Sequence, residues 1–187
     1  MTFSFQTSRR RVLGAFSGLA LVGASPMVSS TTFHRPTRQR DLAMNHTHTN
    51  EHLDLVYAVG QRYLPQALVN LDHFLRDHYS GIVGSMDPGL YDIMHKIRLE
   101  LKVKTPFHII SGYRSPDTNE HLRVSRGGGV ARRSLHMDGK AIDLRIPGVP
   151  LKEVRDAALS LNAGGVGYYP RDRFIHIDTG KVRSWKG

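Results

Sequence analysis

Apolar residues recur at steps of three and four along two segments, one starting at Pro65 and one following Asp87-Pro88. This spacing places the apolar side chains on one face of a helix and polar residues on the other. Asp followed by Pro is a favoured helix start, because Pro suits the first helical position. We therefore expect one helix from Pro65 that stops by Gly81 and a second from Pro88 to Leu101.

Strand patterns dominate the second half of the chain. Residues 106–112 have the β-branched density of a buried strand, and residues 141–146 alternate with period two. Residues 166–169 and 173–178 predict a hairpin, and an amphipathic helix is expected over 151–159. Together these elements predict an α+β fold, with N-terminal helices packed on a small antiparallel sheet of at least four strands.

The first 30 residues have the pattern of an export signal. Three arginines, Arg9 to Arg11, precede an apolar run from Val12 to Val28 that is rich in Gly, Ala and Ser. The adjacent arginines resemble a twin-arginine signal, which predicts export to the periplasm. The alternative is a membrane anchor, but a run of about 17 residues is short for a span that needs ~20.

Residues 31–50 are polar and basic without periodicity, and we expect a linker or a poorly ordered segment there. Residues 51–187 are then expected to form a single domain. His46, His48 and His52 cluster near the boundary. They are compatible with a metal site or with an edge strand, and the pattern favours the strand.

Net charge and cysteine content bear on two questions, whether the protein binds nucleic acid and whether disulfides stabilise it. The formal net charge is +10, but six of the 26 Lys and Arg residues and none of the 16 acidic residues lie in residues 1–40. The remainder has 20 basic and 16 acidic residues, a net charge of only +4. This modest excess does not indicate a nucleic-acid groove, although it suits a polyanionic polymer. The chain has no cysteine, so an exported form relies on its core rather than on disulfides.

One set of residues has the composition of a catalytic zinc site. His136 and Asp143 are seven residues apart, and His176 follows on a predicted strand. Two imidazoles and one carboxylate are a ligand set that zinc uses when its fourth position is kept for water. With 11 histidines in the chain, the spacing alone is weak evidence. Asp143 and His176 can nevertheless face each other on neighbouring strands, with His136 arriving from the preceding loop.

Four segments carry a resemblance to a known family. They are Ser-Gly-Tyr-Arg-Ser at 111–115, Ser-Leu-His-Met-Asp-Gly-Lys-Ala-Ile-Asp at 134–143, Ala-Gly-Gly-Val-Gly-Tyr-Tyr-Pro at 163–170 and Phe-Ile-His-Ile-Asp-Thr-Gly at 174–180. In this order they resemble the LAS zinc peptidases, related to the D-alanyl-D-alanine carboxypeptidases and dipeptidases. The likeness is greatest to the murein endopeptidase K branch and spans about residues 45–187.

The resemblance implies the LAS peptidase fold, Zn²⁺ as cofactor, and His136, Asp143 and His176 as its ligands. It also implies that Arg114 stabilises the oxyanion that forms on the substrate carbonyl. The implied activity is hydrolysis of peptidoglycan cross-links, between two meso-diaminopimelate residues or between D-alanine and meso-diaminopimelate. The alternatives are a D,D-carboxypeptidase that trims terminal D-Ala and a non-catalytic peptidoglycan-binding protein.

The chain departs from its relatives at the general base. Many carry an acid three residues before the last histidine ligand, where this chain has Arg173, and others carry a histidine at the position of Phe174. Asp178 is the first candidate, because it shares a strand face with the last histidine. It would either take the proton from water or orient a ligand. Asp138 and Asp172 are the next candidates.

Overall fold

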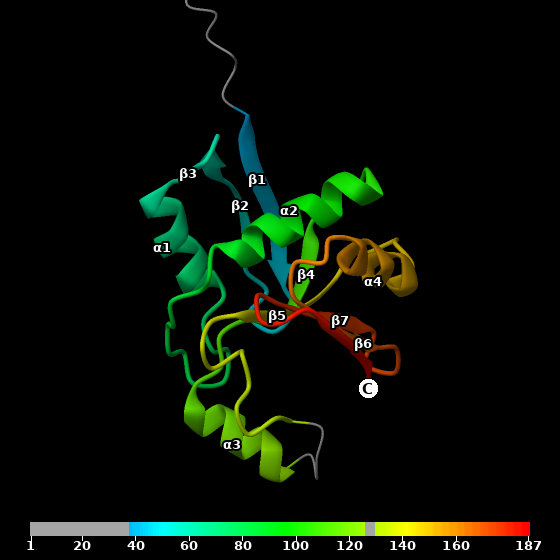
Figure 1. Ribbon diagram of the computed structural model, residues 1–187. Coiled ribbons are helices and arrows are strands. Elements are labelled where there is room, and N and C mark those ends of the chain that lie inside the picture. The colour runs from blue at the N-terminus through cyan, green and yellow to red at the C-terminus, as the bar shows by residue number, and fades with distance from the viewer. Residues whose placement is uncertain (1–37, 126–129) are drawn as a thin grey trace, which may run out of the picture. The chain divides into compact units, whose positions relative to one another are not determined.

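The computed structural model describes residues 38–125 and 130–187, so the predicted signal at 1–30 lies outside the described residues. In this part of the chain the strands form one sheet in the order β3-β2-β1-β4-β5-β7-β6-β8 (Figure 1). The strands are Gln39–His46 (β1), His52–Val59 (β2), Arg62–Tyr63 (β3), Phe107–Ser111 (β4), Ala141–Arg145 (β5), Gly165–Tyr169 (β6), Phe174–Asp178 (β7) and Arg183–Lys186 (β8). The helices are Pro65–Phe74 (α1), Gly89–Leu101 (α2), Pro116–Ser125 (α3) and Leu151–Ser160 (α4).

The mixed α+β class is confirmed, but the sheet is larger than expected. The four predicted strands, β4, β5, β7 and β6, are neighbours and pair antiparallel. The outer pairs β1–β4 and β6–β8 are parallel, and the β1–β2 hairpin precedes the helices. The sheet is therefore mixed and eight-stranded, where N-terminal helices on a small antiparallel sheet were predicted.

The linker prediction for residues 31–50 is wrong from Gln39 onward. Leu42 and Met44 on β1 are 0% and 1% exposed, and the half-buried residues Asp41, Ala43 and Asn45 alternate with them. This period-two pattern is the signal of a strand. β2 pairs with β1 along most of its length and β4 pairs with its last three residues, so the polar composition does not prevent strand formation.

The turn between β1 and β2 holds only part of the histidine cluster. His46 is 2% exposed, and its Nδ1 accepts the backbone N–H of His48 at 3.2 Å. His48 stacks on His78, with ring centroids 4.2 Å apart, whereas His52 lies 2.7 Å from the side-chain oxygen of Asn45. In residues 38–125 and 130–187 the one group with metal-ligand spacing lies elsewhere. His46 ends β1 and His52 begins β2, so the strand interpretation holds for these two residues, but β1 lies inside the sheet rather than at its edge.

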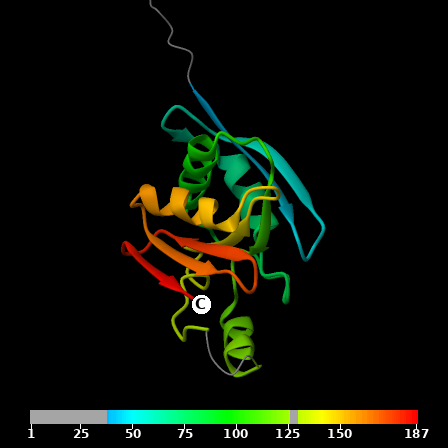
Figure 2. The same ribbon diagram turned by 90° about the vertical axis from the view of Figure 1, so that its right-hand side faces the viewer.

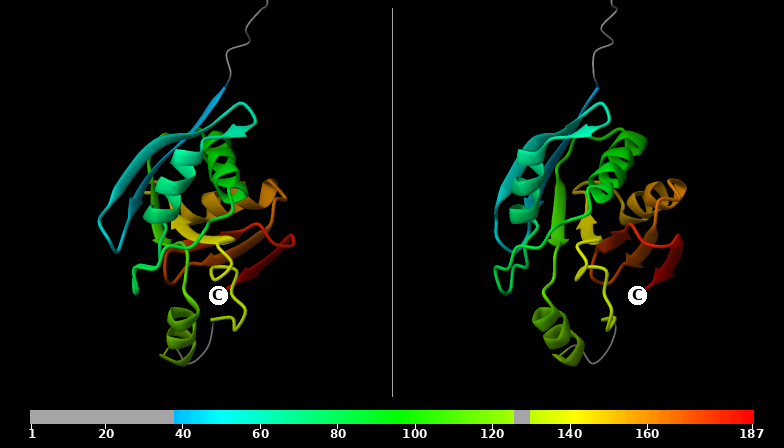
Figure 3. Two further views of the ribbon diagram at one scale, coloured as in Figure 1. Left: turned by 90° about the vertical axis from the view of Figure 1, so that its left-hand side faces the viewer. Right: turned by 60° about the vertical axis from the view of Figure 1, so that its left-hand side comes forward.

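Helices α1, α2 and α4 cover one face of the sheet, as Figures 2 and 3 show, and α3 lies apart from them. The core between these layers includes Ile142 and Leu144 of β5 and Ile175 and Ile177 of β7, all 0–1% exposed. Burying each such side chain contributes roughly 1.5–3 kcal/mol. A one-residue slip would expose them, so the core fixes the register of both strands and leaves their other positions facing away from the helices.

Helix α1 ends at Phe74, before the predicted stop at Gly81, because the buried carboxylate of Asp77 organises the following turn. Asp77 accepts the backbone N–H of Tyr79 and of Ser115, both at 2.9 Å. Burial raises the pKa of Asp77, but its hydrogen bonds outweigh burial and hold that pKa well below the usual range. The turn after α1 is thereby tied to the segment that carries Arg114.

Candidate metal centre

A row of paired residues crosses the sheet on the face away from the helices. Ser111 of β4 is opposite Asp143 of β5, which is opposite His176 of β7. Gly167 of β6 lies opposite His176 and, on its other side, opposite Trp185 of β8. The predicted facing positions of Asp143 and His176 are therefore found, and pairing extends the row to five strands.

His136 reaches this row from the loop before β5. Its Nδ1 lies 2.7 Å from the carbonyl oxygen of Gly112, which can only accept a hydrogen bond, so Nδ1 carries the proton. The loop itself packs tightly: Gly139 has φ of 65°, and a Cβ there would overlap the carbonyl oxygen of Ser85. A hydrogen bond of 2.8 Å from the backbone N–H of Asp87 to the Gly139 carbonyl holds the loop at the start of α2.

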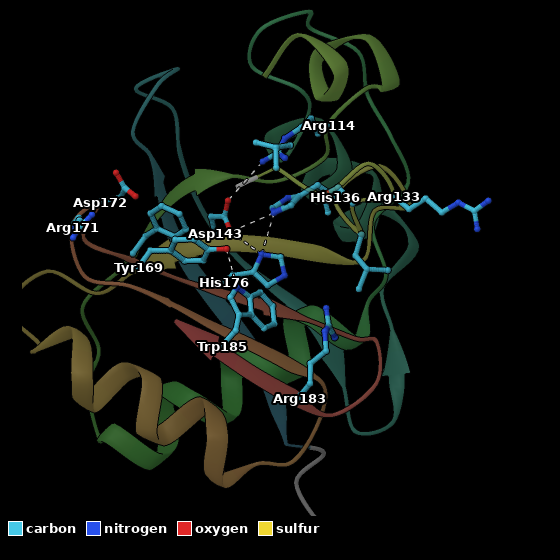
Figure 4. A pocket seen from close by; sticks show the side chains of 15 residues that line it. Arg114, Arg133, His136, Asp143, Tyr169, Arg171, Asp172, His176, Arg183 and Trp185 are labelled. Atoms are coloured by element: carbon cyan, nitrogen blue, oxygen red, sulfur yellow. Dashed lines mark hydrogen bonds and ion pairs between the residues drawn. The ribbon is translucent and has the colours of Figure 1, made fainter. Parts of the chain in front are cut away.

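The three predicted ligands come together (Figure 4). His176 Nδ1 lies 2.9 Å from Asp143 Oδ1 and 3.3 Å from His136 Nε2, and His136 Nε2 lies 3.3 Å from Asp143 Oδ1. All three side chains are buried. The other ring nitrogens are held by Gly112 and Asp178, which directs a nitrogen of each imidazole at the same point. This donor set fits a divalent metal that accepts nitrogen and oxygen ligands.

Negative partners dominate the electrostatics of the row. Burial lowers the pKa of His176, but hydrogen bonds to Asp143 and Asp178 outweigh burial and raise it to about 9. Burial lowers the pKa of His136. Burial would raise the pKa of Asp143, but the two imidazoles hold it far below its usual range. The carboxylates thus remain ionised and favour a cation between the rings.

Arg114, which the resemblance implies as a site residue, lies beside the three candidate ligands. Its Nη2 is 3.9 Å from Asp143 Oδ2, and it donates longer hydrogen bonds to Ser111 and Asn119, at 3.4 and 3.3 Å. Its side chain is only 13% exposed and lines a cavity next to the ligands. A guanidinium held there can donate to an oxygen of a bound substrate.

Asp178 is fully buried beside His176, on the side away from Asp143. Its Oδ2 accepts from His176 Nε2 at 3.1 Å and from Arg183 at 2.7 Å, and its Oδ1 accepts the backbone N–H of Gly165 and Gly180. Burial would raise the pKa of Asp178, but these bonds keep it well below its usual range. Of the two roles considered for Asp178, the geometry fits orientation of a ligand rather than proton transfer.

The cavity has a volume of about 840 Å³, and a group of aromatic and charged side chains lines it beside the three candidate ligands and Arg114 (Figure 4). These are Arg133, Tyr169, Arg171, Asp172, Phe174, Arg183 and Trp185. Trp185 is the one tryptophan of the chain, a signal that was available in the composition. Its position became clear only from the pairing of β8 with β6.

The expected position of a general base is not filled by an acid. Arg173 is exposed, and Phe174 stacks on Tyr169 with ring centroids 4.6 Å apart. Asp138 is exposed and does not line the cavity. Besides Asp143, Asp172 is the carboxylate that lines the cavity among the described residues.

A buried His-Asp-His set next to an arginine and a cavity defines a candidate metal-dependent hydrolase. A family model described as peptidoglycan L,D-endopeptidase MepK matches residues 34–185. The chain belongs to this family of M15 metallopeptidases.

The relatives match over most of their length. The peptidoglycan L,D-endopeptidase MepK of Escherichia coli (strain K12) is 44% identical over 182 residues, which are 97% of this chain and 98% of that protein. The protein of the same name from Shigella flexneri matches equally well. A probable peptidoglycan L,D-endopeptidase MepK of Haemophilus influenzae is 42% identical over 151 residues, 80% of this chain and 81% of that protein.

Proposed function

We propose that the chain is an exported zinc peptidase that hydrolyses peptide cross-links of peptidoglycan. The bonds cleaved join two meso-diaminopimelate residues, or D-alanine and meso-diaminopimelate. The observation that carries the proposal is the convergence of His136, Asp143 and His176 beside the cavity. The activity for which the relatives are named supports the substrate, and the motif order supports the LAS peptidase fold.

Each side chain around the candidate metal site has a separate role in the proposed hydrolysis. His136 Nε2, Asp143 Oδ1 and His176 Nδ1 would hold zinc, while Asp178 orients the ring of His176. Zinc bound by such a set supplies a Lewis acid for the scissile carbonyl and lowers the pKa of a water ligand to about 7. Arg114 donates hydrogen bonds to the carbonyl oxygen as negative charge develops there. The C–N bond then breaks, and a proton from the attacking water goes to the leaving amine.

To test the proposal, purified protein is supplied with zinc and incubated with muropeptide dimers of each linkage, and the products are separated by chromatography. We expect dimers to become monomers, a chelator to stop the reaction and added zinc to restore it. His136→Ala should lose both bound zinc and cleavage, whereas His121→Ala, an exposed histidine of α3, should lose neither. Trimming of D-Ala with dimers intact would identify a D,D-carboxypeptidase, and binding without cleavage a peptidoglycan-binding protein.

Export to the periplasm by the twin-arginine route belongs to the same proposal. It is supported by Arg9 and Arg10 ahead of the apolar run. No helix within residues 38–125 and 130–187 is long and apolar enough to cross a membrane. Cell fractionation of the double variant Arg9→Lys, Arg10→Lys should find the protein retained in the cytoplasm. Unchanged export would contradict the twin-arginine route, but it would not bear on the proposed peptidase activity.

A further inference from the structure

Three aromatic side chains form one wall of the cavity. Tyr169 stacks on Phe174 with an interplanar angle of 17°, and Trp185 packs against His176 with ring centroids 5.2 Å apart. Tyr169 lies two positions beyond Gly167 on β6 and opposite Phe174 of β7, so it shares the sheet face of the metal ligands. The neighbouring Tyr168 points to the other face. The wall is therefore continuous with the ligand row (Figure 4).

Trp185 is held in place from several sides. It is opposite Gly167, and a Cβ at that glycine would come within 2.7 Å of the indole ring. The absence of a side chain there lets the indole lie across β6 and reach His176. The guanidinium of Arg183 lies 4.9 Å from the centre of the indole and is itself anchored on Asp178. The direction of the indole N–H is fixed by these contacts.

The indole N–H of Trp185 sets the direction of hydrogen bonding at the Tyr169 hydroxyl. Trp185 Nε1 donates to the Tyr169 hydroxyl oxygen at 2.8 Å, and an indole nitrogen can only donate. The hydroxyl oxygen is thus the acceptor in this bond, and its own proton points elsewhere. Within residues 38–125 and 130–187 no hydrogen bond from this proton to a protein acceptor is formed, and the phenol lines the cavity. An accepted hydrogen bond also makes a hydroxyl a better donor.

We propose that Tyr169 is a catalytic residue that donates a hydrogen bond to the reacting peptide group, and that Trp185 is the residue that positions it. The inference rests on the proposed peptidase function. Tyr169 acts from β6, whereas Arg114 acts from the segment after β4, so two donors from separate segments stabilise charge on the substrate. The phenol keeps its proton throughout, so no proton acceptor is required of it.

Tyr169→Phe tests the first part, because phenylalanine keeps the stacking on Phe174 and removes only the hydroxyl. We expect kcat for muropeptide dimers to fall about 10²-fold, the loss typical of one oxyanion donor. Zinc content and melting temperature should match those of the wild type. The Kd of the metal-free protein for the dimer should stay within twofold of the wild-type value. Tyr168→Phe, on the opposite face, is the matched control and should keep wild-type kcat.

A double-mutant cycle tests the second part. Trp185→Phe should lower kcat about tenfold in the wild-type background and have little effect in the Tyr169→Phe background, because its effect passes through the phenol. An unchanged kcat in Tyr169→Phe, or a loss that coincides with loss of zinc, overturns the role of Tyr169. Equal losses from Trp185→Phe in both backgrounds overturn the positioning role. A wild-type protein that cleaves no dimer overturns the proposed function itself and the inference with it.

Discussion

His176 donates a hydrogen bond from Nε2 to Oδ2 of Asp178 over 3.1 Å, while its Nδ1 faces Asp143 at 2.9 Å. A carboxylate on the remote nitrogen fixes the ring and raises its basicity as a ligand. Because Asp178 is fully buried and bonded on both oxygens, it holds one position of the imidazole.

Asp178→Asn should therefore weaken zinc binding about 10–100-fold, the usual cost of losing such a partner. The amide can still accept a hydrogen bond, but it lacks the negative charge. Competition with a chelator of known affinity measures the change. Asp156→Asn, an exposed carboxylate on α4 paired with Arg155, serves as control and should bind zinc like wild type. Equal zinc affinity in the two variants would contradict the orienting role.

Arg114→Lys should lower kcat about 10²-fold while the zinc content stays at one ion per chain. Lysine keeps the charge but loses the planar fork that donates to two oxygens at once. Steady-state cleavage of muropeptide dimers gives kcat and KM separately, and the loss is expected in kcat. Arg132→Lys alters an exposed arginine that does not line the cavity, and it should have no effect. A change confined to KM would show that Arg114 only binds substrate.

Two glycines with positive φ offer a matched test of the metal loop. Gly148 has φ of 76° with open space around it, and Gly139 has φ of 65° with Ser85 in the place of a side chain. Gly148→Ala should cost about 1 kcal/mol of folding free energy from backbone strain alone. Gly139→Ala should cost more and also weaken zinc binding, because the loop that carries His136 must move. Urea unfolding and chelator competition measure both, and equal behaviour of the variants would contradict tight packing of the loop.

The buried His46 should make folding stability depend on pH. Burial, followed by the nearby imidazoles of His78 and His48, lowers its pKa from 6.5 to about 4. The unfolded chain then binds the proton more readily than the folded one, so stability falls as pH drops from about 6.5 towards 4. Between pH 7 and pH 5 the loss from this one group is about 1–2 kcal/mol.

His46→Asn separates this effect from release of metal at low pH. The asparagine oxygen can still accept the backbone N–H groups of the turn, but it does not titrate. Urea unfolding of both proteins at pH 7 and pH 5 should show a smaller pH-dependent loss in the variant. Metal release contributes equally to both, so identical pH dependence would mean that His46 is not responsible.

The parts of the site that follow from local pattern were predictable from the sequence. Alternation along β5 and β7 places Asp143 and His176 on the face opposite Ile142 and Ile177, and the core enforces that choice. The four neighbouring strands β4, β5, β7 and β6 and the starts of α1 and α2 follow from the same kind of periodicity. Arg114 and the three candidate ligands were predicted through motifs, and the structure brings them together.

The parts that depend on pairing between distant segments were not predictable. β8 is four residues long, has no alternating pattern, and exists because β6 offers it a parallel partner. The contact of Trp185 with Tyr169 depends on that pairing and could not be inferred from either residue. The role of Asp178 depends on which imidazole nitrogen faces it, and strand alternation does not specify a ring orientation.

The row of paired residues across five strands also limits how the chain can change in length. The loop between β6 and β7, residues 170–173, is exposed at 171–173, so residues can be added or removed there without touching the ligands. Between Phe174 and His176 a single insertion or deletion would place an isoleucine at the position of His176 and point the histidine towards the core. Metal binding and folding would then be lost together, so we expect no functional variant in which this part of β7 is longer or shorter by one residue.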